Sequence, residues 1–211
     1  ERTKNRPIAS KKISVKLGFL YASILCFLAL GILIQFNKFT IILALISMPI
    51  AFAYPLIKRF SYWPQLFLGI TFNYGLILGW TSVNENLNII PIIFYFGAIF
   101  WTLGYDTIYG FQDIKDDEII GLKSTSIKFK TNPYIFLYTC YSIFFITLII
   151  IGYLMELNQL YFISLILIFF QMFLFQLKKL DTKNSSSCLK IFKSNNLLGL
   201  MIFIGVVLGK I

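Results

Sequence analysis

Long apolar runs separated by short polar segments dominate the chain. A helix needs about 20 mostly apolar residues to cross the hydrocarbon core of a membrane. Seven stretches without a charged residue approach this length: Lys16 to Lys38, Lys38 to Lys58, Arg59 to Glu85, Glu85 to Asp106, Lys130 to Glu156, Glu156 to Lys178, and Lys193 to Lys210. The runs lack the alternation of an outer-membrane barrel. We therefore predict an all-α membrane protein with seven transmembrane helices.

Polar and turn-forming residues place the helix ends. The first four helices are predicted near residues 17–35, 39–54, 65–80 and 89–109. The fifth begins after Asn132 and Pro133, the sixth ends near Leu177, and the seventh follows a Lys/Ser/Asn-rich loop over 178–194. Between Tyr54 and Pro64, two prolines bracket a basic pair, which predicts a helix break at Tyr54–Pro55 and an interfacial loop. The chain has no internal repeat and reads as one membrane domain, 1–211.

Composition and charge agree with this arrangement. The chain is 58% hydrophobic and only 13% charged, too apolar for the surface of a soluble domain. Of its 19 basic residues, 17 fall on alternate loops counted from the N-terminus, and only Lys38 and Lys210 fall on the other side. This asymmetry predicts that the N-terminus and the loop after residue 110 are cytoplasmic. The same asymmetry accounts for the net charge of +10, so a nucleic-acid-binding function is not needed to explain it. A bacterial inner membrane is expected, with the mitochondrial inner membrane as the alternative.

The residues available for chemistry are few. There is no histidine, which removes the usual general base and the commonest transition-metal ligand. Cys26, Cys140 and Cys188 have no short spacing, which indicates packing rather than a metal or disulfide role. Chemistry must therefore use carboxylates, Lys, Arg, Tyr or the backbone.

Carboxylates are concentrated after the fourth apolar run. The chain has nine acidic residues, and four of them lie within residues 113–118, with Asp106 just upstream. On one continuous helix, at about 100° per residue, Asp106, Asp113 and Asp117 share a stripe roughly 40° wide. Gly110 on the same stripe leaves room beside them, and Asp116 sits to one side.

Such closely packed carboxylates repel each other unless a cation joins them. Hard oxygen ligands four residues apart suit Mg²⁺, which keeps some water and commonly bridges to a substrate phosphate. We therefore predict a magnesium–diphosphate site with Asp113, Asp117 and Asp116 as ligands. The alternative is a solvated loop whose acids pair with the nearby Lys115, Lys123 and Lys128.

Lys58 and Arg59 are expected on the same membrane face. Opposite a magnesium-bound diphosphate they would neutralise the leaving group. The alternative is that they only anchor a loop at the membrane surface.

Four segments together resemble the UbiA-type membrane prenyltransferases over essentially the whole chain. They are ERTKNRPIASKKIS at 1–14, YPLIKRFSYWPQLFLG at 54–69, GYDTIYGFQDIKDDEIIGLKSTSIKF at 104–129 and FKSNNLLGL at 192–200. The third segment is the most specific, because it matches the second D-x-x-x-D motif of the family with Asp113 and Asp117. Lys123, Ser124 and Thr125 follow it as in the family.

The family's first motif, N-D-x-x-D-x-x-x-D, has no match in the chain. In the family it lies just before the segment matched here by Arg2 to Pro7. The resemblance implies a bundle of nine helices, of which the chain supplies helices three to nine. We expect two helices and half of the metal site to lie upstream of Glu1, and the chain alone to be inactive.

The resemblance also implies a reaction. A polyprenyl group would pass from polyprenyl diphosphate to carbon 3 of 4-hydroxybenzoate, with Mg²⁺ as cofactor, in ubiquinone biosynthesis within the lipid bilayer. No obligate protein partner is expected. The implied catalytic residues are Lys58, Arg59 and Asp106. The implied substrate-binding residues are Lys123, Arg2, Arg6 and Tyr109.

Other functions remain open at this stage. A related enzyme with another aromatic or quinone-precursor acceptor would share these motifs. CDP-alcohol phosphatidyltransferases also use membrane carboxylates, but nothing resembling their D-G-x-x-A-R element precedes the acidic cluster. A cation transporter would place such acids near mid-membrane, whereas here they sit beside a loop.

Overall fold

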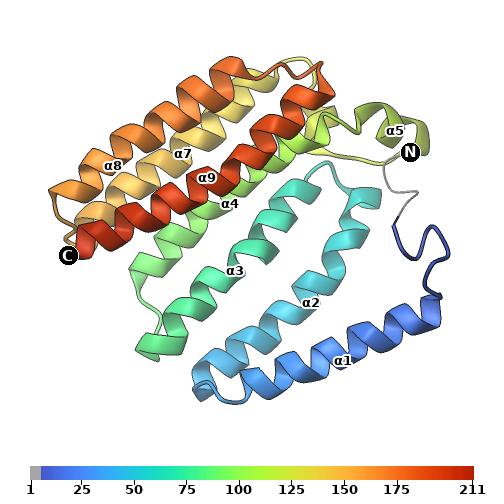
Figure 1. Cartoon of the computed structure of the whole chain (residues 1–211), viewed down its shortest axis with the longest axis horizontal. Coiled ribbons are helices and arrows are strands. Elements are labelled where there is room, and N and C mark those ends of the chain that lie inside the picture. The colour runs from blue at the N-terminus through green and yellow to red at the C-terminus, as the bar shows by residue number, and fades with distance from the viewer. Residues whose placement is uncertain (1–5) are drawn as a thin grey trace.

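A computed structural model describes residues 6–211 of the chain (Figure 1). The regular secondary structure of that range is entirely helical. The elements are α1 (Val15–Leu33), α2 (Lys38–Phe60), α3 (Pro64–Asn84), α4 (Ile89–Gly110), α5 (Ile114–Ile120), α6 (Thr125–Lys128), α7 (Pro133–Leu154), α8 (Gln159–Phe169), the π-helix η1 (Phe170–Leu177) and α9 (Ser185–Lys210). Seven helices are long and apolar enough to cross a membrane, with α8 and η1 forming one span. The predicted fold class and number of spans are confirmed.

Local sequence signals explain most of the helix starts. Asparagine side chains accept hydrogen bonds from the first backbone N–H groups of α2, α4, α8 and α9, as N-cap residues do. Pro133 occupies the first turn of α7, where its missing N–H costs nothing, so the predicted restart at Asn132–Pro133 is confirmed.

The predicted break at Tyr54–Pro55 is wrong. α2 continues through Pro49 and Pro55 and ends only at Phe60. A proline removes one intrahelical hydrogen bond, and an apolar helix that must pair its backbone internally can continue through it. Lys58 and Arg59 therefore lie in the last turn of a helix and not in a loop.

The start of α9 also differs from the prediction. The loop assigned to 178–194 is shorter, because α9 begins at Ser185, where Asn184 caps it. Lys190 and Lys193 are consequently helical residues.

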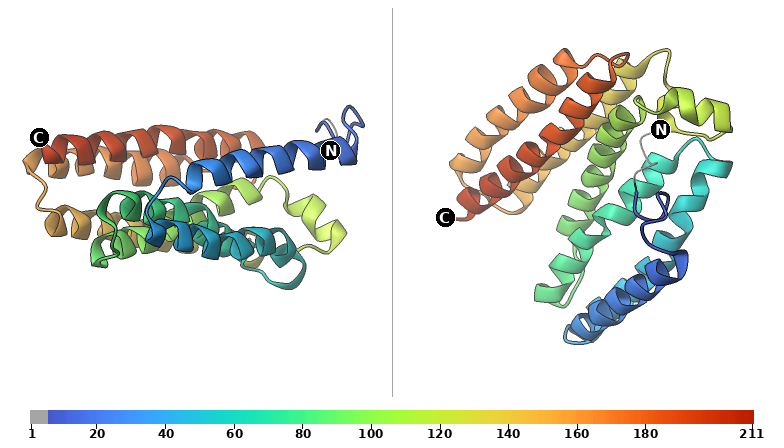
Figure 2. Two further views of the ribbon diagram at one scale, coloured as in Figure 1. Left: turned by 90° about the horizontal axis from the view of Figure 1, so that it is seen from below. Right: turned by 45° about the vertical axis from the view of Figure 1, so that its right-hand side comes forward.

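The core lies between α4, α7, α8 and α9. Its largest fully buried side chains include Tyr141 and Phe144 of α7 and Tyr161 of α8. Gly104 of α4 lies so close to Tyr141 that a Cβ there would be 2.6 Å from the ring, and this allows α4 and α7 to pack tightly. α3 packs on α4 and α2 packs on α3, while α1 has no buried residue and lies at the edge (Figure 2).

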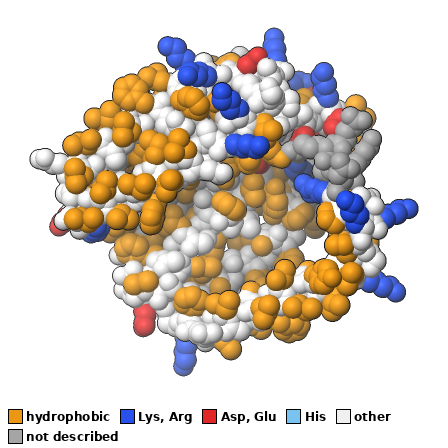
Figure 3. Space-filling model, in the orientation of Figure 1, with side chains coloured by type: hydrophobic (Ala, Val, Ile, Leu, Met, Phe, Trp, Pro, Cys, Tyr) orange, Lys and Arg blue, Asp and Glu red, His pale blue; other side chains and the backbone are white. Residues whose placement is uncertain are grey.

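The fold brings distant segments to one end of the bundle. The C-terminal ends of α2 and α4, the start of α3, and the short helices α5 and α6 all lie there (Figure 1). Lys and Arg side chains gather around this end, and hydrophobic side chains line a hollow between α9 and the α1–α3 side (Figure 3). This arrangement places the predicted acidic and basic residues next to an apolar interior.

Candidate active site

Lys58 and the acidic segment meet at this end of the bundle. The charge of Asp106, a half-buried residue in the last turns of α4, is within electrostatic reach of both Lys58 and Asp113. The backbone N–H of Lys123 donates a hydrogen bond to the carbonyl oxygen of Lys58 at 2.9 Å. Residues from α2, α4 and the α5–α6 segment thus form one cluster. Arg59, the next residue on α2, is exposed.

The continuous helical stripe predicted for the carboxylates is wrong in its geometry. α4 ends at Gly110, and Phe111 to Asp113 form a turn whose N–H groups bond three residues back instead of four. Asp113 is the residue that precedes α5, where Asp117 is buried and Asp116 is exposed. Asp106 and Asp113 are within electrostatic reach of each other across this turn, and not along a continuous helix.

The space beside Gly110 has a different use from the one predicted. A Cβ at this position would meet Ser126 Oγ well inside contact distance and would lie 3.3 Å from Gln65 Nε2. Gly110 therefore makes room for the packing of protein side chains against α4, and not for a cation.

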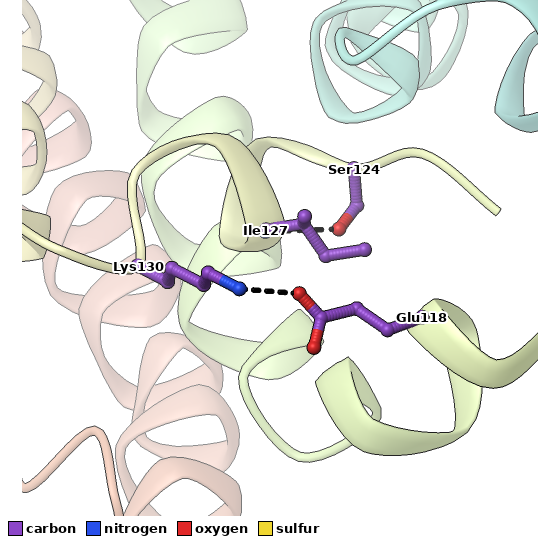
Figure 4. A network of polar contacts seen from close by, with 4 residues as sticks. All are labelled: Glu118, Ser124, Ile127 and Lys130. Carbon is purple, nitrogen blue, oxygen red and sulfur yellow. Dashed lines mark hydrogen bonds and ion pairs between the residues drawn. The ribbon is translucent and has the colours of Figure 1, made fainter. Parts of the chain in front are cut away.

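Lys123 lies beside the end of α2. Its ammonium group donates to the carbonyl oxygen of Phe60 at 3.4 Å and sits 5.4 Å from the ring centre of Tyr62. Lys130 forms an ion pair with Glu118, the last acid of the cluster, while the hydroxyl of Ser124 caps α6 by accepting from Ile127 N (Figure 4). Of the lysines proposed as simple partners of the acids, Lys128 lies 4.3 Å from the ring centre of Trp63.

The other predicted substrate-binding residues are spread around this end. Tyr109 is half-buried in the last turn of α4, with its ring 4.4 Å from that of Phe192 on α9. Arg6 is exposed in the segment before α1. Arg2 lies outside the described residues.

Carboxylate oxygens are the right donor type for Mg²⁺. Within residues 6–211, no group of three or more His, Cys, Asp or Glu side chains is placed to hold one metal ion. Mg²⁺ is commonly bound by one or two carboxylates together with substrate phosphates and water, and the pair Asp106 and Asp113, which are within electrostatic reach of each other, fits that mode.

Two adjoining cavities lie between α3, α4 and α9, and they share Asn73 and Trp101. One has a volume of about 280 Å³ and is lined by Tyr105, Phe192, Lys193, Asn195 and Asn196 as well as Phe72. The other has a volume of about 300 Å³ and an almost wholly apolar lining, including Phe94, Phe144, Gly199 and Phe203. Tyr105 and Phe192 line the first cavity, and Tyr109 also contacts Phe192, so this cavity lies beside the last turns of α4.

Sequence reasoning did not assign several residues of this region. Tyr54 is within electrostatic reach of Asp106 from α2. Asn195 accepts hydrogen bonds from Trp101 Nε1 at 2.8 Å and from Gln176 Nε2 at 3.3 Å. Polar residues inside apolar spans are the signal that points to such positions, because a polar side chain is costly there unless it is paired.

The sequence profile of the UbiA prenyltransferase family matches residues 1–202. The chain belongs to the UbiA prenyltransferase family. Its relatives include the mitochondrial 4-hydroxybenzoate polyprenyltransferase of Rattus norvegicus, 37% identical over 212 residues, which cover this whole chain and 56% of the relative. A 4-hydroxybenzoate geranyltransferase of Lithospermum erythrorhizon is also 37% identical, over 69% of its own length. The chain thus spans little more than half of the rat UbiA enzyme.

The arrangement of helices is that of a solved UbiA structure. A UbiA homolog from Aeropyrum pernix K1 superposes with a TM-score of 0.81 over all of this chain and 78% of that protein, at 19% identity. At this identity the likeness concerns the fold. It confirms the UbiA-type arrangement of membrane helices that the motifs implied.

Proposed function

We propose that this protein is a magnesium-dependent aromatic prenyltransferase that transfers a polyprenyl group from polyprenyl diphosphate to carbon 3 of 4-hydroxybenzoate, as a step of ubiquinone biosynthesis. The observation that carries the proposal is the cluster of Lys58, Asp106 and Asp113, with Asp106 within electrostatic reach of Tyr105, which lines the adjoining cavity. Family membership and the substrates in the names of the rat and Lithospermum relatives support it.

The donor has a charged head and an apolar tail, and the site has the matching two parts. The diphosphate would lie between Lys58, Lys123 and the α5 carboxylates, while the isoprenoid chain would enter the apolar cavity beside Trp101. When bound, Mg²⁺ would neutralise the diphosphate and make it a better leaving group. Asp113 and Asp117, with Asp116 beside them, are the residues we assign to hold it.

The reaction then needs little covalent chemistry from the protein. The bond between C1 of the prenyl group and the diphosphate oxygen breaks, and the negative charge that develops on the diphosphate is stabilised by Lys58. Carbon 3 of the ring attacks C1, and the C3 proton passes to the released diphosphate or to water, which restores aromaticity. Asp106 orients the substrates from α4, and Tyr105 and Phe192 offer aromatic faces to the acceptor ring and the allylic cation.

The basic end of the bundle is assigned to the cytoplasmic side of a bacterial inner membrane, or to the equivalent side of the mitochondrial inner membrane. The proposal predicts that membranes containing the native protein release diphosphate from a prenyl diphosphate and form prenylated 4-hydroxybenzoate only when Mg²⁺ and both substrates are present. Mass spectrometry identifies the product. Diphosphate release that persists in Asp113→Ala would contradict the proposed site.

Two competition experiments with the same assay define the substrates. In the first, geranyl diphosphate competes with a long-chain polyprenyl diphosphate as the donor, because the relatives include both a polyprenyltransferase and a geranyltransferase. In the second, other aromatic acids compete with 4-hydroxybenzoate as acceptors. Equal use of several acceptors would contradict a dedicated role in ubiquinone synthesis.

A further inference from the structure

A buried set of polar residues fixes the segment that follows the acidic helix. Thr125 N donates to Oε1 of Gln65 at 3.0 Å, and Gln65, in the first turn of α3, is only 3% exposed. Two residues earlier, Lys123 N is bonded to the Lys58 carbonyl. The segment between α5 and α6 is therefore tied to the end of α2 and to the start of α3.

A second tie runs to α4. The hydroxyl of Thr107 donates to Leu103 O at 2.6 Å, so its single proton is used within its own helix. The hydroxyl of Thr125, 2.6 Å from Thr107 Oγ1, must then be the donor between these two threonines. Ser126 Oγ donates to Thr107 O at 2.8 Å. We call Gln65, Thr107, Thr125 and Ser126 the polar latch.

The side chains of the latch are buried and bond to other protein groups. Thr107, Thr125 and Ser126 have no exposed surface, and the hydrogen bonds that define the latch join protein atoms. Burying these polar groups has a desolvation cost that four apolar side chains of similar size would avoid. What the polar groups add is directional hydrogen bonding, which holds the segment in one position relative to α2, α3 and α4.

That position bears directly on the site. The latched segment directly follows α5, which carries Asp116 and Asp117 and is preceded by Asp113. The segment also includes Lys123, whose N–H is bonded to the Lys58 carbonyl. We propose that Gln65 and Thr125 are positioning residues, which set the placement of the α5 carboxylates relative to Lys58 for binding of the diphosphate. This inference deepens the proposed function and rests on it for its kinetic consequence, while its structural part stands by itself.

The test uses the native protein in membranes with four variants. Gln65→Met removes the acceptor for Thr125 N at similar volume, and Thr125→Val removes the latch hydroxyl. Thr125→Ser retains the hydroxyl and serves as the conservative variant. Thr147→Val is the matched control, because Thr147 is also buried and its hydroxyl donates to Ile143 O of its own helix.

The first measurement does not depend on activity. Hydrogen–deuterium exchange of the amides in residues 114–128 is expected to accelerate about 10-fold in Gln65→Met and Thr125→Val, as loss of roughly one hydrogen bond allows. Thr125→Ser and Thr147→Val are expected to leave it within about twofold. Unchanged exchange in both disruptive variants, or an equal rise in the control, would overturn the proposal.

The second measurement separates positioning from general structure. Gln65→Met and Thr125→Val are expected to raise the KM for the prenyl diphosphate and the half-saturating Mg²⁺ concentration about 10-fold, with the KM for 4-hydroxybenzoate unchanged. Faster exchange with unaltered kinetics would show a purely structural latch and refute the positioning role. If the wild type forms no prenylated product, the proposed function fails, and the exchange result still decides whether the latch exists.

Discussion

The backbone N–H of Lys123 donates to the carbonyl of Lys58 at 2.9 Å, although 65 positions separate the two residues in the sequence. The carbonyl of Lys58 lies in the last turn of α2, where helix carbonyls have no partner within the helix. The segment after the acidic helix satisfies this carbonyl. The same bond places Lys123 beside the end of α2, where the charge of Lys58 is within reach of Asp106 on α4.

Lys58→Met is expected to lower kcat/KM for the prenyl diphosphate by about 10²–10³-fold, because we propose that this side chain stabilises charge that develops on the leaving diphosphate. Lys58→Arg should retain part of the activity. Lys38→Met, at the opposite end of the bundle, is the control and should change the rate less than twofold. A loss of the same size in Lys38→Met would refute the specific role of Lys58.

Asp113→Asn and Asp117→Asn are expected to abolish detectable transfer and to raise the Mg²⁺ concentration needed for any residual activity. Removing a carboxylate withdraws a hard, anionic oxygen ligand while keeping the shape of the side chain. The measurement is a Mg²⁺ titration of diphosphate release. Glu85→Gln, in the loop at the other end of α3, serves as the control, and a wild-type Mg²⁺ dependence in both aspartate variants would exclude them as ligands.

Gly110→Ala is expected to destabilise the protein by about 1–3 kcal/mol, since a Cβ would displace Ser126 Oγ, which is buried and hydrogen-bonded to Thr107 O. Thermal unfolding in detergent measures the change. Adding Ser126→Gly should recover part of the loss by removing the obstructing atom. Gly79→Ala, with nothing within 4 Å of the added Cβ, is the control. Equal melting temperatures for Gly110→Ala and Gly79→Ala would contradict the packing described.

Gly199→Leu is expected to favour short donors. A Cβ at Gly199 would lie 3.5 Å from Trp101 Cη2, so a larger side chain extends into the apolar cavity that we assign to the isoprenoid. We expect kcat/KM for a long polyprenyl diphosphate to fall at least about 10-fold more than for geranyl diphosphate. Leu200→Phe, at an exposed neighbouring position, is the control. An equal loss of kcat/KM for both donors would show that the isoprenoid does not bind in this cavity.

The sequence alone was sufficient to predict the number of membrane-spanning helices. Charge-free runs between Lys16 and Lys210 predicted seven spans, because unpaired backbone is too costly in lipid and only a helix pairs it locally. Four segments, of which the one with Asp113 and Asp117 is the most specific, indicated the family by their resemblance to it. These properties depend on local composition and periodicity, which a sequence displays directly.

The tertiary structure decided what the helices do to one another. The filling of the space beside Gly110 by Ser126 and the bond from Lys123 N to the Lys58 carbonyl each depend on a partner in another element of the fold. Gln65 and Thr125 become neighbours only when α3 and α6 meet, so no spacing in the sequence marks them as a pair. Helix formation is settled by contacts within a few residues, whereas the position of one carboxylate relative to one lysine is settled by packing across the whole bundle.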